Sequence, residues 1–318
     1  MKKRHLFWII LAMCIFFAGC GNAGNENVAM VQEFPIETTE EITDETTEKP
    51  EAAAVLEVEK EEVFVFEDIE VEVNGDKGTI LVGTTGVPYT ELLTQAKKQL
   101  AADGWDLQIK FYEDYAQLNQ DLLNGALDTH LFAHPTYVKN YNEVNKTELV
   151  DVAPVCYEVY GVYSKSNDDL TQIPGATIAL PEDEEKKARA LLFMQDLGWI
   201  VLKDGVGMTA IEEDIVENEK NLQFVEYTPE SLETVMGESD YCIIGADTAI
   251  VAGLDVEDDV IRAETNSNIS AQTYAACLVT TQEKTEDEKM KVLAEAFASG
   301  EMLEFVEDTY KGALQIMK

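Results

Sequence analysis

Short apolar runs alternate with stretches of helical spacing from residue 77 to the C-terminus. The apolar runs predict strands at 79–83, 106–112, 127–132, 148–155, 176–180, 222–227 and 241–244. Apolar residues three and four apart predict helices at 89–102, 115–124, 134–145 and 184–197, with a short helix ending at Gly253 and two helices after residue 280. Strands that alternate with helices are typical of a parallel α/β sheet.

The predicted elements are too many for one typical domain. An apolar, aromatic stretch at 157–164 enters a second set of strands and helices. We therefore expect an α/β protein of two lobes with a cleft between them, the second lobe inserted in the first. The boundaries are 77–157 for the first part of lobe 1, 158–264 for lobe 2, and 265–318 for the return to lobe 1.

The N-terminus carries a different pattern. Met1–His5 is basic, Leu6–Phe17 has no charge, and Ala18-Gly19-Cys20 follows. This arrangement predicts a secretory signal peptide over 1–19. The ending resembles a bacterial lipobox, in which Cys20 becomes the first residue and carries a diacylglyceryl group. The alternative is an uncut membrane anchor, but the apolar run is shorter than the roughly 20 residues that span a bilayer.

Residues 20–76 predict an acidic, disordered tether that joins the lipid to the lobes. Positions 21–76 hold 18 Asp or Glu residues against Lys49 and Lys60. Within the tether, apolar residues partly alternate over 63–73, so this part could form an extra edge strand. We expect the tether to provide reach away from the membrane.

The formal charge of the 318-residue chain is -39. Such a surface repels nucleic acid and anionic lipid head groups, so we expect neither as a partner. Of the five cysteines, Cys14 leaves with the signal and Cys20 would be acylated. Cys156, Cys242 and Cys277 lie in apolar runs, which predicts buried free thiols in preference to a disulfide. Their spacing matches no structural zinc motif.

Few residues outside the signal peptide belong to a recognisable catalytic or ligand-binding motif. The chain has no Gly-rich phosphate loop, no His-Glu-x-x-His and no nucleophile elbow. His130 and His134 would point to one face of a strand, about 13 Å apart, which disfavours a shared metal. Arg189 lies in the first turns of the 184–197 helix, where it could bind a carboxylate. The alternative is a surface ion pair with Glu185 or Glu182.

Several segments, in the right order from Thr79 to the C-terminus, resemble the NlpA/MetQ family, the methionine-binding lipoproteins of ABC importers. The segments that carry the resemblance are Val82–Leu92, Asp114-Tyr115, Asn124–Asp128 with Phe132, His134 and Tyr137, Gly161–Ser164, Pro181 with Arg189–Leu192, Leu202–Gly207, and 214–222.

This resemblance implies a type II periplasmic-binding-protein fold, with an amino acid enclosed between the lobes. The ligand carboxylate would meet Arg189, and its apolar side chain would lie against Phe132, His134 and Tyr137. We also expect Tyr89, Tyr160 and Asp247 to bind the ligand. The implied partners are an ABC permease and its ATPase. The implied location of this protein is the extracytoplasmic face of the cell membrane, where the N-terminal lipid anchors it. We expect no cofactor, no metal and no enzymatic activity.

The sequence departs from the family in part of the pocket. The usual Asn-Asp-Pro-Thr/Ser-Asn after Pro181 is replaced by residues 182–186, Glu-Asp-Glu-Glu-Lys. Two usual Asn residues, one of which grips the ligand, become Gly245 and Asp247, a Tyr becomes Thr248, and a Ser-Pro-Tyr segment becomes residues 267–269. Two alternatives stay open: a cationic or peptide-like solute, prompted by the added acids, and a surface-displayed interaction lipoprotein with a degenerate pocket.

Overall fold

The computed structural model describes residues 66 and 68–318. Its larger sheet has six strands in the order β13-β4-β12-β3-β1-β2. Strand β1 pairs in parallel with β2 and β3, whereas β12 and β13 run antiparallel to their neighbours. The strands are β1 (Gly78–Thr84), β2 (Trp105–Phe111), β3 (Thr129–Leu131), β4 (Leu149–Glu158), β12 (Ala276–Thr281) and β13 (Leu314–Ile316).

The smaller sheet has five strands in the order β11-β5-β10-β6-β9. Its strands are β5 (Tyr160–Tyr163), β6 (Thr177–Pro181), β9 (Gln223–Tyr227), β10 (Tyr241–Gly245) and β11 (Arg262–Ala263). All of them lie between β4 and β12 in sequence. The smaller sheet is therefore inserted in the larger one, and the chain passes between them at 158–160 and again at 264–275. A separate hairpin joins β7 (Val201–Leu202) to β8 (Ile215–Glu217).

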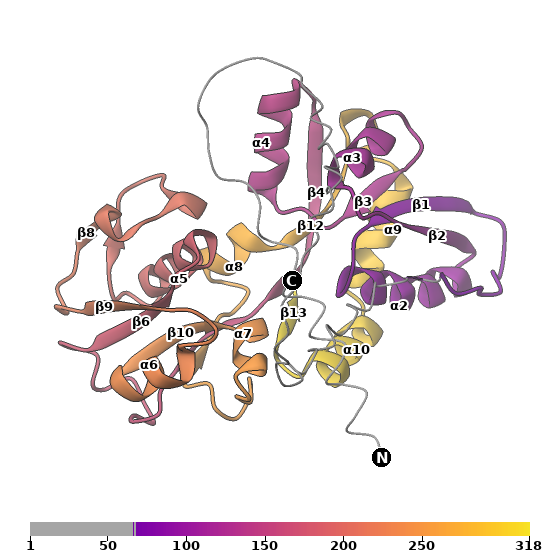
Figure 1. The fold of residues 1–318 in the computed structure, drawn as a ribbon. Helices are drawn as coiled ribbons and strands as arrows, with labels where there is room; N and C mark the ends of the chain where they lie inside the picture. The colour runs from indigo at the N-terminus through magenta and orange to yellow at the C-terminus, as the bar shows by residue number, and fades with distance from the viewer. Residues whose placement is uncertain (1–65, 67) are drawn as a thin grey trace, which may run out of the picture. The chain divides into compact units, whose positions relative to one another are not determined.

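Helices accompany both sheets, as Figure 1 shows. Their apolar faces build separate cores, one around Ile80, Leu93 and Phe297 and another around Ile178, Phe193 and Tyr241. The helices are α2 (Tyr89–Ala102), α3 (Tyr115–Leu123), α4 (Pro135–Asn145), α5 (Glu184–Asp196), α6 (Leu232–Glu238), α7 (Ala246–Val251), α8 (Ile269–Tyr274), α9 (Glu288–Phe297) and α10 (Gly300–Tyr310), and short 3-10 turns cover Gly207–Thr209, Glu212–Asp214 and Gln282–Lys284.

The two-lobed α/β fold with an inserted second lobe is confirmed. The prediction of parallel sheets is wrong in part, because both sheets are mixed. Strands β5 and β12, which follow the two crossings, run against their neighbours. Gly125, just after α3, has the left-handed conformation that suits a helix C-terminus, at φ 77°. Cys156, Cys242 and Cys277 are buried and free, as predicted.

The described end of the predicted tether contacts the larger sheet. Phe66 packs against its core, and Asp68 accepts hydrogen bonds from Lys97 Nζ at 2.7 Å and from the Ile109 main-chain N–H at 3.2 Å. Residues 66 and 68–73 form no strand, which corrects the expected edge strand there. Residues 63–65 and 67, together with Cys20 and the signal segment, lie outside the described residues. No helix within 68–318 is long and apolar enough to cross a membrane.

Candidate functional site

Arg189 is buried at the centre of the site. Helix α5 carries it, and its guanidinium Nη2 donates to Glu264 Oε2 at 2.8 Å and to the main-chain oxygen of Glu158. Its side chain is 7% exposed, and its Nε has no hydrogen-bond partner. The alternative of a surface pair with Glu185 or Glu182 is therefore wrong. The acids that precede Arg189 have a local role instead, because Asp183 caps α5 by accepting from Lys186 N.

Aromatic rings surround the Arg189 guanidinium. Tyr160 lies 4.3 Å and Tyr274 lies 5.0 Å from it, both within the range of cation–π attraction. The Tyr274 ring in turn lies 6.2 Å from that of His134. Tyr274 of α8 thus lies against both the Arg189 guanidinium and the His134 ring. It stands near the point where the chain returns to the larger sheet.

Phe132, His134 and Tyr137 form one aromatic cluster. Phe132 contacts Tyr137 edge-on at 5.2 Å and stacks on Tyr115 at 5.0 Å. His134 caps α4, because its Nδ1 accepts from Tyr137 N at 3.1 Å. Burial, with a smaller contribution from the Arg189 charge, lowers the pKa of His134 to about 4. His134 is therefore neutral at pH 7.

Asp247 begins the other side of the site, in the first turn of α7. Its Oδ2 accepts from Lys186 Nζ at 2.6 Å, and its Oδ1 accepts from the main-chain N–H and the hydroxyl of Thr248. The side chain is 7% exposed. Burial pushes the pKa of Asp247 upward, but the charge and hydrogen bond of Lys186, together with the hydrogen bonds of Glu158 and Thr248, bring the pKa below its usual range. The ammonium that Asp247 binds in this structure is that of Lys186.

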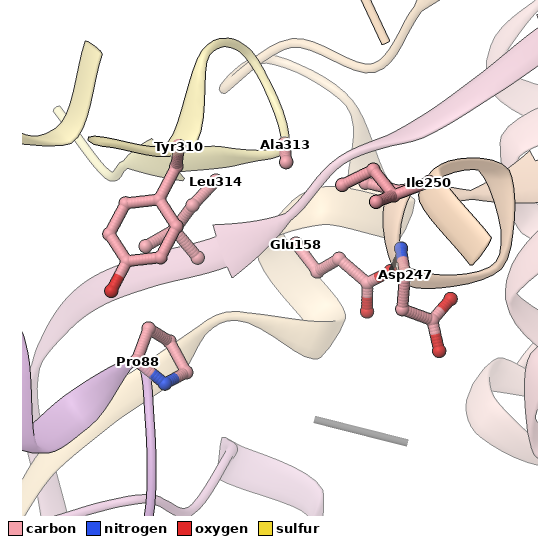
Figure 2. A pocket seen from close by; sticks show the side chains of 8 residues that line it. Pro88, Glu158, Asp247, Ile250, Tyr310, Ala313 and Leu314 are labelled. Atoms are coloured by element: carbon pink, nitrogen blue, oxygen red, sulfur yellow. Dashed lines mark hydrogen bonds between the residues drawn. The ribbon is translucent and has the colours of Figure 1, made fainter. Parts of the chain in front are cut away.

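Glu158 connects Arg189 to Asp247. Its main-chain oxygen accepts from Arg189, and its Oε1 accepts from Asp247 N at 2.8 Å, a contact visible in Figure 2. Removal of the Glu158 carboxyl from water raises its pKa, and the Asp247 charge adds to this rise. A cavity of about 20 Å³ lies beside both residues and is bounded by Pro88 and Tyr310. It has room for about one water molecule.

His130 does not share a site with His134. It is fully buried in β3, and its Nε2 donates to Asn119 Oδ1 at 3.0 Å, while Asn119 Nδ2 donates to the Tyr137 hydroxyl. Burial lowers the pKa of His130 to about 3. Within 68–318, no group of three or more His, Cys, Asp or Glu side chains is arranged to hold a metal ion.

Tyr89 opens α2 and packs against the core of the larger sheet. Burial raises its pKa, and it lies near enough to Tyr115 and Glu158 for their charges to add to the rise. Four further residues of the site were not predicted from the sequence: Glu158, Glu264, Tyr274 and Lys186. Glu264 is 75 residues from Arg189 and Lys186 is 61 from Asp247, so only the tertiary fold brings them together.

The family profile described as NlpA lipoprotein matches residues 80–317, which is most of the chain. The chain belongs to this family. It is 30% identical over 243 residues to the methionine-binding lipoprotein MetQ of Bacillus subtilis, covering 75% of this chain and 88% of that protein. NlpA lipoproteins are a family of substrate-binding lipoproteins, so family membership and the two-lobed fold agree.

Two solved structures show the same fold in relatives of this NlpA lipoprotein. A nutrient-binding protein of Burkholderia cenocepacia, solved bound to methionine, is 29% identical with a TM-score of 0.51 and covers 75% of this chain and all of its own. A periplasmic substrate-binding protein of an ABC transporter from Coxiella burnetii is 30% identical with a TM-score of 0.53, covering 74% and 99%.

Proposed function

We propose that this chain is the solute-binding lipoprotein of an ABC importer, and that it binds methionine or a closely related carboxylic acid between its lobes. The observation that carries the proposal is the buried Arg189 guanidinium, which keeps an unpartnered Nε donor beside the aromatic cluster of Phe132, His134 and Tyr137. A carboxylate is the matching partner for guanidinium donors, and an apolar side chain fits the rings. Two of the relatives support methionine: the Bacillus subtilis protein is named for it, and the Burkholderia cenocepacia protein was solved bound to it.

The ligand would enter when the side chains that now fill the site separate. The cavity beside Glu158 is far smaller than an amino acid, so binding requires the lobes to open and close. Charge-assisted hydrogen bonds contribute roughly 1.5–3 kcal/mol each. Burial of a methionine-sized side chain contributes about 1.5–3 kcal/mol. A few such terms, less the cost of ordering, reach the -8.2 kcal/mol or so of a micromolar complex. No covalent step is involved.

The test is a thermal-shift screen of the full chain in detergent against the amino acids and the 2-hydroxy and 2-oxo analogues of methionine. We expect one class of carboxylic acid to raise the melting temperature, because a ligand at about 100 times its Kd adds about 2.7 kcal/mol. Arg189→Lys, which keeps the charge and loses the planar fork, should abolish most of the shift. Lys187→Ala, a change on the same helix at a lysine that pairs with Glu226, serves as the control.

Arg189 pairs with Glu264, and Lys186 pairs with Asp247. Because these charged groups already have partners within the protein, they favour a second candidate, a surface-displayed lipoprotein whose pocket no longer binds a ligand. A screen in which no amino acid, peptide or analogue shifts the melting temperature would favour this candidate over import. The cationic-solute alternative loses its main support, because Asp183 caps α5, Glu182 and Glu184 are exposed, and Lys186 occupies Asp247.

The proposal includes anchoring through Cys20 at the extracytoplasmic face of the membrane, with the acidic segment as tether. Two or more acyl chains on one residue hold a protein firmly, at about 0.8 kcal/mol per buried methylene. Cys20→Ala should move the protein from the membrane fraction to the soluble fraction or leave the signal uncut. Incorporation of labelled fatty acid into the parent chain and not into the variant would support lipidation.

A further inference from the structure

A chain of buried hydrogen bonds supports the aromatic cluster of Phe132, His134 and Tyr137. His130 Nε2 lies 3.0 Å from Asn119 Oδ1, and Asn119 Nδ2 donates to the Tyr137 hydroxyl at 2.8 Å. The side chains of His130 and Asn119 are fully buried. They belong to β3 and α3, and Tyr137 belongs to α4, so these bonds join three elements at the cluster.

The main-chain oxygen of Tyr115 sets the direction of the bonds in this chain. Asn119 Nδ2 donates to it at 2.9 Å, and a carbonyl oxygen can only accept. The nitrogen end of the amide therefore faces Tyr115 and Tyr137, and its oxygen end faces His130. Burial lowers the pKa of His130 to about 3, so the ring is neutral at pH 7 and its one hydrogen is on Nε2. Reversal of the amide would break bonds on both sides, which is costly in a buried network.

Tyr137 is held at two points. Its main-chain N–H donates to His134 Nδ1 at 3.1 Å, and its hydroxyl accepts from Asn119. Between these two points, its ring contacts Phe132 edge-on at 5.2 Å. Phe132 in turn lies 4.8 Å from the ring of His130. The residues of the hydrogen-bonded chain thus contact two of the three rings of the cluster and restrict how the Tyr137 ring can move.

We infer that Asn119 and His130 are positioning residues of the candidate site, and that they hold the Tyr137 ring in the orientation that meets the apolar side chain of the ligand. The inference rests on the proposed function, because it assumes that this side chain lies against the ring. Both residues act through Tyr137 and need no contact with the ligand. A ring that is fixed before binding loses little freedom on binding, so the network lowers the cost of ordering the site.

The test is a double-mutant cycle on the affinity for methionine, measured by calorimetry with the full chain in detergent. Asn119→Leu nearly keeps the size of the side chain and removes both hydrogen-bonding ends, and Tyr137→Phe removes only the hydroxyl. We expect Asn119→Leu to weaken binding about tenfold in the parent chain and less than about twofold in the Tyr137→Phe background, where the link is already broken. An equal loss in both backgrounds would overturn the inference and leave the proposed function standing.

His130 is tested by a conservative variant and a disruptive one. His130→Gln keeps a donor close to the position of Nε2, so it should bind methionine within about twofold of the parent chain. His130→Leu leaves Asn119 Oδ1 without a donor and should weaken binding about tenfold. Equal affinities in the two variants would contradict the role of His130. If His130→Leu does not fold, the cycle at Asn119 and Tyr137 decides the inference.

Asn142→Leu is the matched control. Asn142 also lies on α4, and both ends of its amide bond the main chain of Leu149, at the start of β4. It should lower the melting temperature without ligand and leave the methionine affinity within about twofold, whereas Asn119→Leu lowers both. A loss of affinity as large as that of Asn119→Leu would show that any loosening of α4 weakens binding, against the inference. Failure of the parent chain to bind methionine would overturn the inference together with the methionine assignment of the proposed function.

Discussion

Gly245 ends β10 at the point where three side chains of the site converge. A Cβ at this position would lie 2.8 Å from Tyr160 Cε2, 3.0 Å from Glu158 Oε1 and 3.1 Å from Asp247 Oδ1. Its φ of -72° suits any residue, so space and not backbone conformation requires glycine. The Tyr160 ring that lies against Arg189 depends on this absence of a side chain.

Gly245→Ala should therefore destabilise the fold by about 1–3 kcal/mol, the usual cost of overpacking. Urea unfolding of the variant measures it. Gly86→Ala is a matched control, because nothing lies within 4 Å of a Cβ there. Tyr160→Leu in the Gly245→Ala background should recover part of the loss. An unchanged free energy of unfolding in Gly245→Ala would show that the neighbours shift without cost.

Glu158 should make stability depend on pH above neutrality. Its pKa is raised in the folded protein, so the folded state holds a proton that the unfolded state releases. Stability is therefore full below the unfolded pKa and falls as the pH rises through the folded one. His130 and His134, whose pKa values are lowered, affect stability between about pH 3 and 6.5 and not above that range.

Between about pH 7 and 8.5, the effect of Glu158 on stability can thus be measured without a contribution from the two histidines. The melting temperature of the parent chain should fall across this window, and that of Glu158→Gln should stay nearly level. Thermal unfolding in closely spaced buffers measures both. Parallel slopes for the two proteins would mean that Glu158 titrates normally.

The segment that precedes β1 protects the free edge of β2. Asp68 accepts from the Ile109 N–H of this edge strand and pairs with Lys97, whose side chain is 9% exposed. Edge strands expose unpaired backbone groups, and a side chain that occupies one is a common way to cover them. Asp68→Ala should cost about 1–3 kcal/mol, because Lys97 and Ile109 N both lose their partner. Glu70→Ala, at an exposed neighbour, should be neutral in the same chemical denaturation experiment.

Long elements were predictable from the chain because their periodicity repeats. Helix α2 begins and ends as expected, and β1 extends the predicted strand by one residue at each end. Helix α8 and strand β13 have six and three residues, too few to show a period, and neither was predicted. Strand β3 ends at Leu131, earlier than expected, because Phe132 turns into the aromatic cluster and His134 caps α4.

The residues of the candidate site were predictable only where a local motif carries them. Phe132, His134, Tyr137 and Arg189 fall in such motifs, and the structure places all four around one site. Glu264 and Lys186 belong to no recognisable motif. In so charged a chain, nothing in the neighbouring sequence distinguishes one acid or one lysine from the others. Their roles arise from tertiary contacts between segments that lie far apart in the sequence.

The Arg189–Glu264 pair joins the inserted lobe to both segments that cross between the sheets. Glu264 Oε2 accepts from Arg189 and also from Tyr160 N at 3.0 Å, so one carboxylate contacts the outgoing crossing, the returning crossing and α5. The same carboxylate neutralises the guanidinium to which a ligand would bind. Stability without ligand and affinity for ligand are therefore opposed at this pair.

Glu264→Gln should separate the two effects. Removal of one partner leaves a buried charge, which costs about 3–5 kcal/mol, so the melting temperature without ligand should fall by several degrees. A ligand carboxylate then becomes the main counter-ion of Arg189, and the ligand-induced rise in melting temperature should exceed that of the parent chain. Calorimetry should give about tenfold tighter binding of the carboxylate. Loss of stability with unchanged affinity would instead show that the pair holds the lobes and takes no part in recognition.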